Sequence, residues 1–397
     1  MPDHRKLGRE LGLFDTDPLI GAGLPYWLPA GAAVRHALEE YVRGVERRSG
    51  YQHVYSPVLA KRELYELSGH WSHYLENLYP PMDLGDEQLV LRPVMCPHHA
   101  LIYRSRPHSY RDLPLRMAEL GGMYRSELSG VLGGLTRVRA IQLNDAHIFA
   151  RPDQVADEVR AALELIRQAY QALGISPSRY RLSLPGTGGK YIANPDMWRQ
   201  AEAVLRDVLD ESGLAYDAVD GEAAFYGPKI DVQVTDSAGR EATLSTVQVD
   251  FHHPAQFDLR YIGPDGGKHP PVKVHLSIIG SMERAVAQLI EVHGGAFPAW
   301  LAPWSARRAP PTARSGTCRP VRRSAAAVPG SCAGGNGRSA RDVGTARAAA
   351  RAVRRRDPWA GTCSRRSWRS ARRIRTVPVW PARGSTHAGS RRGVPRP

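Results

Sequence analysis

The chain has 397 residues, of which 42% are hydrophobic, and a formal net charge of +15 at pH 7. It contains no run of 18 apolar residues, and its first 15 residues are charged and lack an apolar core, so we expect neither a membrane span nor a secretory signal. Three of the four cysteines lie after residue 304, which argues against a disulfide framework and predicts a cytoplasmic protein.

The first hundred residues combine one helix pattern with two strand patterns. Apolar residues recur at helical spacing over residues 32–50, and Gly50 is placed to end that helix. A short strand is predicted over 51–57, where Pro57 stops it, and a second strand over 88–93.

The middle of the chain contains the longest predicted elements. Strands over Leu115–Arg125 and Val138–Ala150, joined by a Gly-rich connection, are predicted to form a long hairpin. The clearest helix covers residues 152–174, opening near a proline and closing at a glycine. A strand over 180–184 and a helix over 196–212 follow.

Three further strands and a helix complete this region. The runs 229–236 and 240–252 are predicted to form a second hairpin that turns at Ser-Ala-Gly, and a strand over 272–278 precedes a helix over 280–295. Adjacent hairpins with helices between them predict an antiparallel sheet with helices packed on it. The expected fold class is therefore α+β and not a doubly wound fold.

The positive charge is concentrated at the C-terminal end. Residues 305–397 contain 23 of the 54 basic residues, all of them Arg, and only two of the 39 acidic residues, so this segment carries +21 and residues 1–304 carry −6. The segment lacks Leu, Phe, Tyr, Met and Gln, and we expect it to be disordered. A nucleic-acid-binding arm and a low-complexity linker are alternatives, but the composition favours GC-rich DNA read in a wrong frame after a frameshift near Pro303 or Trp304.

Charged residues gather in the first predicted hairpin. Arg125 and Glu127 are two residues apart and would share one face of a strand, as would Arg137 and Arg139 on the partner strand. Converging arginines with a carboxylate among them suit phosphate oxygens and an amine, and Arg284, at the start of the last predicted helix, adds a position that favours anions. A solvated face with surface ion pairs is the alternative that the spacing leaves open.

Several motifs resemble those of the class II aminoacyl-tRNA synthetases. The helix and strand that end at Pro57 resemble the first signature motif of that class, which forms the dimer interface. The run LRMAELGGMYRSELSG resembles the second motif, and GSMERAV resembles the third. SYRDLPLRMAELG, NDAHIF, AFYGPKIDV, TVQVDF and IIGSMER with AFPAWLAP match the threonyl-tRNA synthetases, in order, over about residues 3–303. The resemblance implies an antiparallel sheet flanked by helices, a homodimer, and ATP-dependent transfer of L-threonine to tRNA(Thr).

The resemblance also implies a zinc site, with one Zn²⁺ per subunit. Cys96, His147 and His275 match the three zinc ligands of the family, although their spacing fits no zinc finger. Three protein ligands leave one position open, which in this family takes the amino group and hydroxyl of threonine and so rejects valine. Asp145 would accept a hydrogen bond from that hydroxyl.

Further roles follow from the same resemblance. Arg125 would hold the α-phosphate and the threonine carboxylate, Glu127 the adenine amino group, and Arg137 and Arg284 the outer phosphates, with Mg²⁺ bridging the phosphates. His70 matches a histidine implicated in transfer to tRNA, and a surface-loop histidine is the alternative. The remaining substrate-pocket positions, of which Gln248 also belongs to the ATP site, are Tyr226, Lys229, Thr246, Gln248 and Ser281.

The far strand of the first hairpin departs from the family pattern. Ile141 stands where an aromatic residue usually stacks on adenine, a contact of about 1 kcal/mol. Leu143 replaces a polar amide beside the amino acid, and Asn144 and Val94 also differ from the usual residues. We expect these changes to affect ATP affinity and amino-acid selectivity.

The expected domain organisation is a catalytic domain over 1–303 and a tail over 304–397 in place of the anticodon-binding domain. We expect no editing region, so that seryl-tRNA would remain uncorrected, and impaired tRNA recognition, because a core of charge −6 attracts tRNA poorly. A non-catalytic paralogue that binds threonine or an adenylate is the alternative function. A related enzyme for serine or proline conflicts with the Cys, His, His set and with FYGPK.

Overall fold

The computed structural model of the chain describes residues 3–303. The tail over 304–397, with its expected disorder and the frameshift hypothesis, therefore lies outside the described residues. Within the described part, no helix has both the length and the apolar character needed to cross a membrane.

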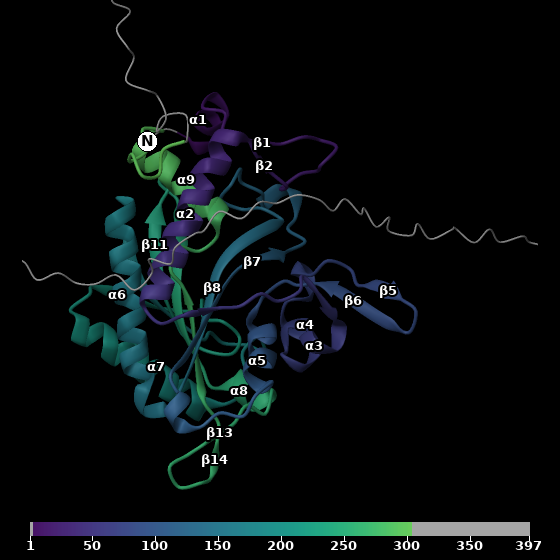
Figure 1. Cartoon of the computed structure of the whole chain (residues 1–397), viewed down its shortest axis with the longest axis vertical. Coiled ribbons are helices and arrows are strands. Elements are labelled where there is room, and N and C mark those ends of the chain that lie inside the picture. The colour runs from purple at the N-terminus through teal and green to yellow at the C-terminus, as the bar shows by residue number, and fades with distance from the viewer. Residues whose placement is uncertain (1–2, 304–397) are drawn as a thin grey trace, which may run out of the picture. The chain divides into compact units, whose positions relative to one another are not determined.

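A central sheet of eight strands runs through the described part of the chain (Figure 1). Its order is β10-β9-β11-β12-β15-β8-β7-β3. The strands from β9 to β7 pair antiparallel, whereas the edge strands β10 and β3 lie parallel to their neighbours. The predicted α+β class is confirmed, with a sheet that is mixed at its two edges. In chain order the strands are β3 (Gln52–His53), β7 (Leu115–Tyr124), β8 (Ala140–Ala150), β9 (Arg179–Leu184), β10 (Tyr216–Asp220), β11 (Lys229–Thr235), β12 (Glu241–Asp250) and β15 (Val272–Ser277).

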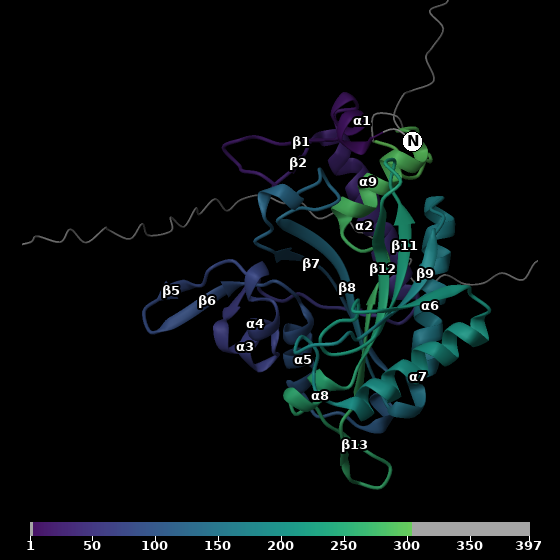
Figure 2. The ribbon, with the colours of Figure 1, turned by 180° about the vertical axis from the view of Figure 1, so that it is seen from behind.

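Four long helices share a hydrophobic core with this sheet. They are α2 (Pro29–Arg48), α6 (Val155–Leu173), α7 (Pro195–Ser212) and α9 (Met282–His293). Helices α6 and α7 lie on one side of the sheet, and the shorter α3, α4 and α5 lie on the other (Figures 1 and 2). The predicted helix ends at Gly50 and Gly174 are confirmed, because both glycines follow their helices with positive φ.

The remaining elements are short. Beside the central sheet stands a three-stranded sheet of order β4-β6-β5. The short elements are α1 (His4–Glu10), β1 (Phe14–Asp15), β2 (Tyr26–Trp27), β4 (Leu59–Lys61), α3 (Arg62–Leu67), α4 (His70–His73), β5 (Met82–Leu84), β6 (Glu87–Leu91), α5 (Cys96–Arg104), α8 (His252–Gln256), β13 (Tyr261–Ile262) and β14 (Lys268–His269), with 3-10 turns at Leu75–Asn77, Tyr110–Asp112, Ser129–Val131 and Pro152–Gln154.

Both predicted hairpins form, as β7–β8 and β11–β12, and the second turns at Ser237–Gly239. They are not neighbours, however, because β15 inserts between β12 and β8. The first hairpin also ends earlier than predicted: β7 stops at Tyr124 and β8 starts at Ala140. The three arginines at 125, 137 and 139, together with Glu127, therefore lie in the connecting loop, and the prediction that they share strand faces is wrong.

Side-chain alternation divides the sheet into a core face and a site face. On β8, Ala146 and Ile148 belong to the hydrophobic core, which turns His147 to the other face. On β15, Val274 and Leu276 are in the core, so His275 also faces away from it. The register places these two histidines directly opposite each other on paired strands. Shifting either strand by one residue would move its histidine into the core.

Candidate active site and metal centre

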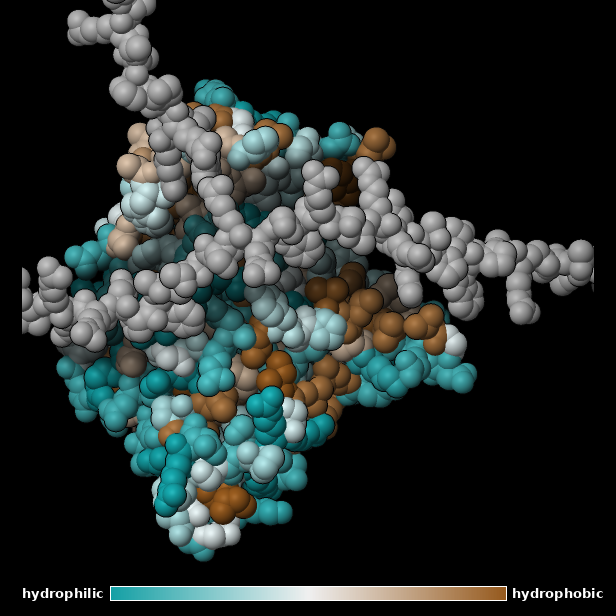
Figure 3. Space-filling view, viewed as in Figure 1, coloured by the Kyte–Doolittle hydropathy of each residue, from teal (hydrophilic) through white to brown (hydrophobic). Residues whose placement is uncertain are grey.

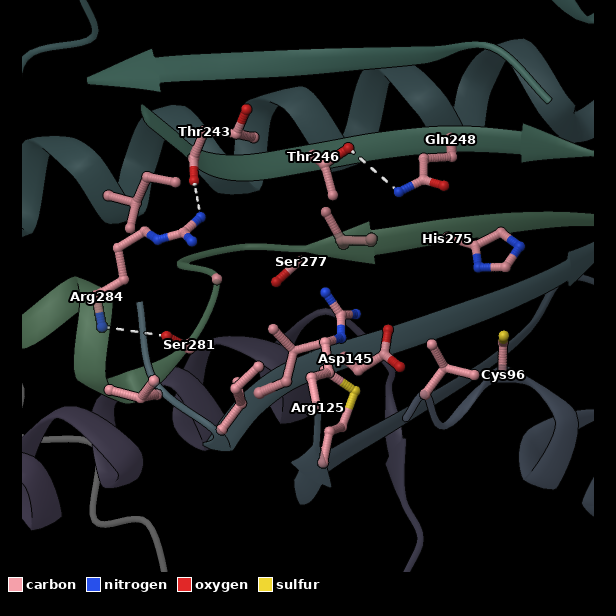
Figure 4. Close-up of a pocket in the computed structure, with 18 of the residues that line it drawn as sticks. Cys96, Arg125, Asp145, Thr243, Thr246, Gln248, His275, Ser277, Ser281 and Arg284 are labelled. Carbon is pink, nitrogen blue, oxygen red and sulfur yellow. Dashed lines mark hydrogen bonds between the residues drawn. The ribbon is translucent and has the colours of Figure 1, made fainter. Parts of the chain in front are cut away.

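A cavity of about 400 Å³ opens on the site face of the sheet. The β7–β8 loop, strands β8, β12 and β15, and the starts of α5 and α9 all contribute to its walls. Figure 4 shows Cys96 and His275 at one end of it, Arg284 at the other, and Asp145 between them. An adjoining cavity of about 420 Å³ shares Arg125 with the first. We call the two ends of the first cavity the cysteine–histidine end and the arginine end.

Three predicted ligands meet at the cysteine–histidine end. The ligand atoms of Cys96, His147 and His275 lie within 4.8 Å of one another, and all three side chains are buried. Cys96 is the first residue of α5, and the two histidines come from paired strands. Residues separated by 51 and 128 positions in the sequence are thus brought together by the sheet register and one helix start.

Hydrogen-bond partners orient both histidine rings. His275 Nε2 lies 2.8 Å from a carboxylate oxygen of Asp250, and His147 Nδ1 lies 2.7 Å from His99 Nδ1. The two remaining nitrogens, His147 Nε2 and His275 Nδ1, face each other at 3.0 Å. If Asp250 holds the proton of His275 on Nε2 and His99 holds that of His147 on Nδ1, the two facing nitrogens both carry lone pairs in a buried space. Two tetrahedral zinc ligands at about 2.0–2.1 Å from the ion stand roughly 3.3 Å apart, so the donor set fits zinc.

Burial sets the protonation of this end. It holds the pKa of His147 well below its usual value and, together with the positive charge of Lys273, lowers the pKa of His275 to about 3. Both rings are therefore neutral at pH 7, as metal ligands must be. Burial also raises the pKa of the Cys96 thiol to about 12, so an incoming metal ion must displace its proton.

A second layer of charged residues lies behind His275. Asp250 Oδ2 is 2.5 Å from His253 Nδ1 and 3.4 Å from Lys273 Nζ. Burial opposes ionisation of Asp250, but its electrostatic interactions with His253 and Lys273 and its hydrogen bonds to His253 and His275 outweigh burial and keep its pKa well below the usual value. The sequence analysis missed this cluster. The only local signal was the pair of histidines after the aspartate in "VDFHH".

Asp145 lies beside one of the three predicted metal ligands. Its side chain is 13% exposed, and one oxygen lies 3.8 Å from His147 Nε2. Burial and the negative charge of Glu119, its direct neighbour on β7, raise the pKa of Asp145 to about 7. A hydrogen-bond donor or a cation arriving here would favour the ionised carboxylate.

The arginine end holds three guanidinium groups. Arg137 pairs with Glu127 at 2.7 Å, Arg284 donates to the carbonyls of Thr136 and Thr243, and Arg125 Nε is 3.4 Å from one carbonyl. Burial and the charges of the other two arginines lower the pKa of Arg284. Three cations around one carboxylate form a cavity suited to a polyanion.

Arg139 does not belong to this group. Its guanidinium donates to the carbonyls of Ala22 and Glu127 and does not line the cavity. The expectation that it shares a ligand-facing surface with Arg137 is wrong, because both residues lie in the loop and not on a strand. Arg139 braces that loop against the N-terminal segment.

Each of the remaining predicted pocket residues lines one or both of the two cavities. Tyr226 donates to Gln248 Oε1 at 2.8 Å, and Gln248 lies 3.4 Å from the hydroxyl of Thr246. Ser281 lines the first cavity and caps α9 by accepting from the backbone N–H of Arg284. Lys229 lines only the adjoining cavity, where it donates to Asp231.

His70 lines the adjoining cavity as a buried residue. Its side chain is 1% exposed, its Nδ1 lies 2.8 Å from Ser68 Oγ, and its Nε2 lies 3.7 Å from Cys96 Sγ. Its ring stacks on that of His253 at 5.4 Å. The alternative of a surface-loop histidine is therefore wrong.

The four unusual residues do not all reach the cavity. Ile141, Leu143 and Val94 line it and contribute to an apolar wall. Asn144 instead points into the protein, where its amide donates to Glu46 of α2 at 2.6 Å and accepts from the backbone of Ile278. Three of the four substitutions can therefore touch a ligand directly, and Asn144 cannot.

The chain is similar to a known protein family and to several curated proteins. Residues 79–293 match the tRNA synthetase class II core domain (G, H, P, S and T). The threonine–tRNA ligase of Geobacillus sp. (strain WCH70) is 55% identical over 303 residues, which are 76% of this chain and 47% of that protein. The threonine–tRNA ligase 1 of Bacillus subtilis (strain 168) is 54% identical over the same shares. The chain thus spans about half the length of the curated relatives it matches.

Solved structures agree as well. A structure titled as the RNA binding domain of threonyl-tRNA synthetase from Cryptosporidium parvum matches with a TM-score of 0.72 and 37% identity, over 76% of this chain and 75% of that one. The prolyl-tRNA synthetase of Giardia lamblia matches with a TM-score of 0.60, over 75% of this chain and 54% of that one. At 16% identity, the second match shows the fold alone.

Proposed function

Since the chain belongs to the class II aminoacyl-tRNA synthetases and, among them, to the threonyl-tRNA synthetase family, we propose that it activates L-threonine with ATP and transfers it to tRNA(Thr). The observation that carries this proposal is the joining of two sites in one cavity. A buried Cys, His, His set lies at one end, and three arginines lie at the other.

In this proposal Cys96, His147 and His275 hold one Zn²⁺. Bound there, the ion would supply Lewis-acid coordination of the amino group and hydroxyl of threonine. Asp145 accepts the hydrogen bond of that hydroxyl, and Tyr226 and Gln248, already joined to each other, line the amino-acid site. Valine lacks the hydroxyl and would leave these polar groups without a partner, so the site rejects it.

At the arginine end, we assign the ATP phosphates to Arg125, Arg137 and Arg284, and a Mg²⁺ ion bound together with ATP would offset part of the phosphate charge. Glu127 would accept a hydrogen bond from the adenine amino group. A threonine carboxylate oxygen attacks the α-phosphorus, the bond to the bridging oxygen breaks, and pyrophosphate leaves. Arg125 stands where both reactants meet and acts by positioning and charge.

Transfer to tRNA completes the proposed reaction. A ribose hydroxyl of the tRNA attacks the carbonyl carbon of the adenylate, AMP leaves, and the hydroxyl proton needs an acceptor. His70 lines the cavity that adjoins the amino-acid site and is our candidate for this role. Because residues 1–304 carry a net charge of −6, we expect the core to attract tRNA weakly and to activate threonine better than it charges tRNA.

We also propose a cytoplasmic homodimer. In the segment that resembles the first class II motif, Tyr55 is 77% exposed, and Val58, which directly follows this segment, is also exposed. Hydrophobic side chains also gather near β5, where Met82 and Leu84 are exposed (Figure 3). A second copy of the chain would cover such a surface.

Threonine-dependent exchange between pyrophosphate and ATP tests this function. We expect the purified, zinc-loaded chain to catalyse exchange with threonine, weakly with serine, and not with valine. Absence of exchange from a folded protein that contains zinc would contradict the proposal and favour the alternative, a synthetase-like protein that binds threonine or an adenylate without catalysis.

A further inference from the structure

The two proposed histidine ligands are supported by carboxylates in different ways. His275 Nε2 contacts Asp250 directly, whereas His147 Nδ1 is linked to a carboxylate through another histidine. His147 Nδ1 lies 2.7 Å from His99 Nδ1, and His99 Nε2 lies 3.2 Å from Glu119 Oε2. All of the side chains in this chain of contacts are buried.

The surroundings of Glu119 fix the direction of these hydrogen bonds. Its two oxygens accept from the guanidinium of Arg92 and from the backbone N–H and hydroxyl of Ser56. A carboxyl group whose two oxygens both accept hydrogen bonds in this way is ionised. It has no proton to donate, so His99 must donate to it from Nε2. A neutral His99 then accepts at Nδ1, and His147 must donate from its own Nδ1. The nitrogen left with a lone pair is His147 Nε2, which faces His275.

We propose that His99 and Glu119 are positioning residues that hold His147 in the tautomer and orientation needed to bind the metal ion. The proposal rests on the zinc site proposed above. It assigns a role in metal binding to the neighbouring strand β7, which carries Glu119, although the three proposed ligands come from α5, β8 and β15. Partners of this kind typically change metal affinity by about 10–100-fold when they are removed.

Arg92 anchors the far end of this chain of contacts. It is 1% exposed, donates to the Gly122 carbonyl, and also contacts the hydroxyl and carbonyl of Ser56. The guanidinium of Arg92 compensates the negative charge of Glu119. Its contacts with Ser56 also join Glu119 to the segment that precedes β4. Glu119 therefore cannot turn away from His99 without leaving a buried guanidinium unpaired.

The neighbouring histidine provides a matched control. His98 and His99 are consecutive residues of α5 and both are buried. His98 packs against Tyr65, and neither of its ring nitrogens has a hydrogen-bond partner among the described residues. Of these two histidines, only His99 shares a helix face with Cys96, because it follows Cys96 by three residues. A general effect of removing a buried histidine would appear at both positions.

The test measures zinc affinity by competition with a chelator, and the absorption spectrum of the Co²⁺-substituted protein. We expect His99→Leu to lower zinc affinity by about 10–100-fold and to alter the Co²⁺ spectrum. His99→Asn, whose side-chain oxygen can replace Nδ1 as the acceptor, should stay within about threefold of the unsubstituted chain. His98→Leu should leave both readouts unchanged.

His99→Gln keeps the inference testable if the leucine variant fails to fold. Its amide falls where Nε2 lay, so it can contact Glu119 but not His147, and we expect the same loss as for leucine. Unchanged affinity and spectrum in the leucine or glutamine variant, or an equal loss in His98→Leu, would overturn the inference while the zinc site stands. Failure of the unsubstituted chain to bind zinc would overturn both proposals.

Discussion

The two ends of the cavity are built on different principles. The three ligand side chains of the cysteine–histidine end come from paired strands and a helix start, are buried, and already face one another. At the arginine end, Arg125 and Arg137 lie in the β7–β8 loop, and the Arg137 side chain is 50% exposed. Its guanidinium is occupied by Glu127.

This difference predicts how each end responds to its ligand. The cysteine–histidine end needs only to exchange a thiol proton for a cation, since its histidines are already oriented. At the arginine end, Arg137 and Arg284 must exchange contacts with Glu127 and with backbone carbonyls for contacts with phosphates. We therefore expect threonine to bind a preformed site and ATP to bind by rearranging the loop.

Removing the thiolate ligand should have the largest effect. In Cys96→Ser we expect zinc binding to be lost and threonine-dependent exchange to fall by about 10³-fold or more, because a site built around a substrate hydroxyl supplies discrimination on the order of 10⁴. Zinc content and exchange rate are the two measurements. Full exchange from a zinc-free variant would show that the cysteine–histidine end does not bind threonine through a metal.

Arg284→Ala removes a positive charge from the arginine end and leaves the cysteine–histidine end unchanged. We expect kcat/KM for ATP in the exchange reaction to fall by about 10²-fold, because one fixed charge at the developing negative charge is lost. Threonine affinity, measured without ATP, should not change. Arg160→Ala on the exposed surface of α6 is the control and should behave like the unsubstituted chain. Loss of threonine binding in the Arg284 variant would show that the two ends are not independent.

Glu127→Gln sharpens the comparison, because Glu127 both pairs with Arg137 and is assigned to adenine. Losing a charged hydrogen-bond acceptor of adenine costs about 1.5–3 kcal/mol, so we expect the KM for ATP to rise about tenfold or more. If the pairing with Arg137 mainly hinders ATP binding, the KM will fall instead. Steady-state exchange over a range of ATP concentrations decides between the two results.

The smallest effect is expected from restoring an aromatic residue. Ile141 lines the cavity, and Ile141→Phe would provide a ring on which adenine can stack. A gain of about 1 kcal/mol corresponds to a KM for ATP that is about fivefold lower. The KM for threonine should be unchanged, since the substitution acts at the nucleotide site. A higher KM for ATP would show that the aliphatic wall already fits the base.

Local patterns predicted the elements better than the site. Apolar spacing and a closing glycine located α6. The helix begins three residues later than predicted, because the first three residues of the predicted range form a 3-10 turn. Alternation located the strands of both hairpins. It could not show that β15 lies between them, because strand order depends on contacts between distant segments.

The proposed metal ligands could not have been found from spacing. Cys96, His147 and His275 meet through strand register, and only the family resemblance singled them out. Neither the spacing nor the family resemblance identified the residues that support the proposed ligands. Asp250, Glu119 and His99 each read as an ordinary buried or surface residue until the sheet places them beside the ligands. Buried polar networks have no sequence period, and this explains the omission.

The central claim is that the cysteine–histidine end is preformed and works without the arginine end. Calorimetric titration of threonine into the zinc-loaded chain, the zinc-depleted chain and the Arg284→Ala variant, all without ATP, tests it directly. The account predicts equal threonine affinity for the zinc-loaded chain and the variant, no detectable binding after zinc removal, and none of valine in any sample. Threonine binding that survives zinc removal, or that disappears in the arginine variant, would contradict it.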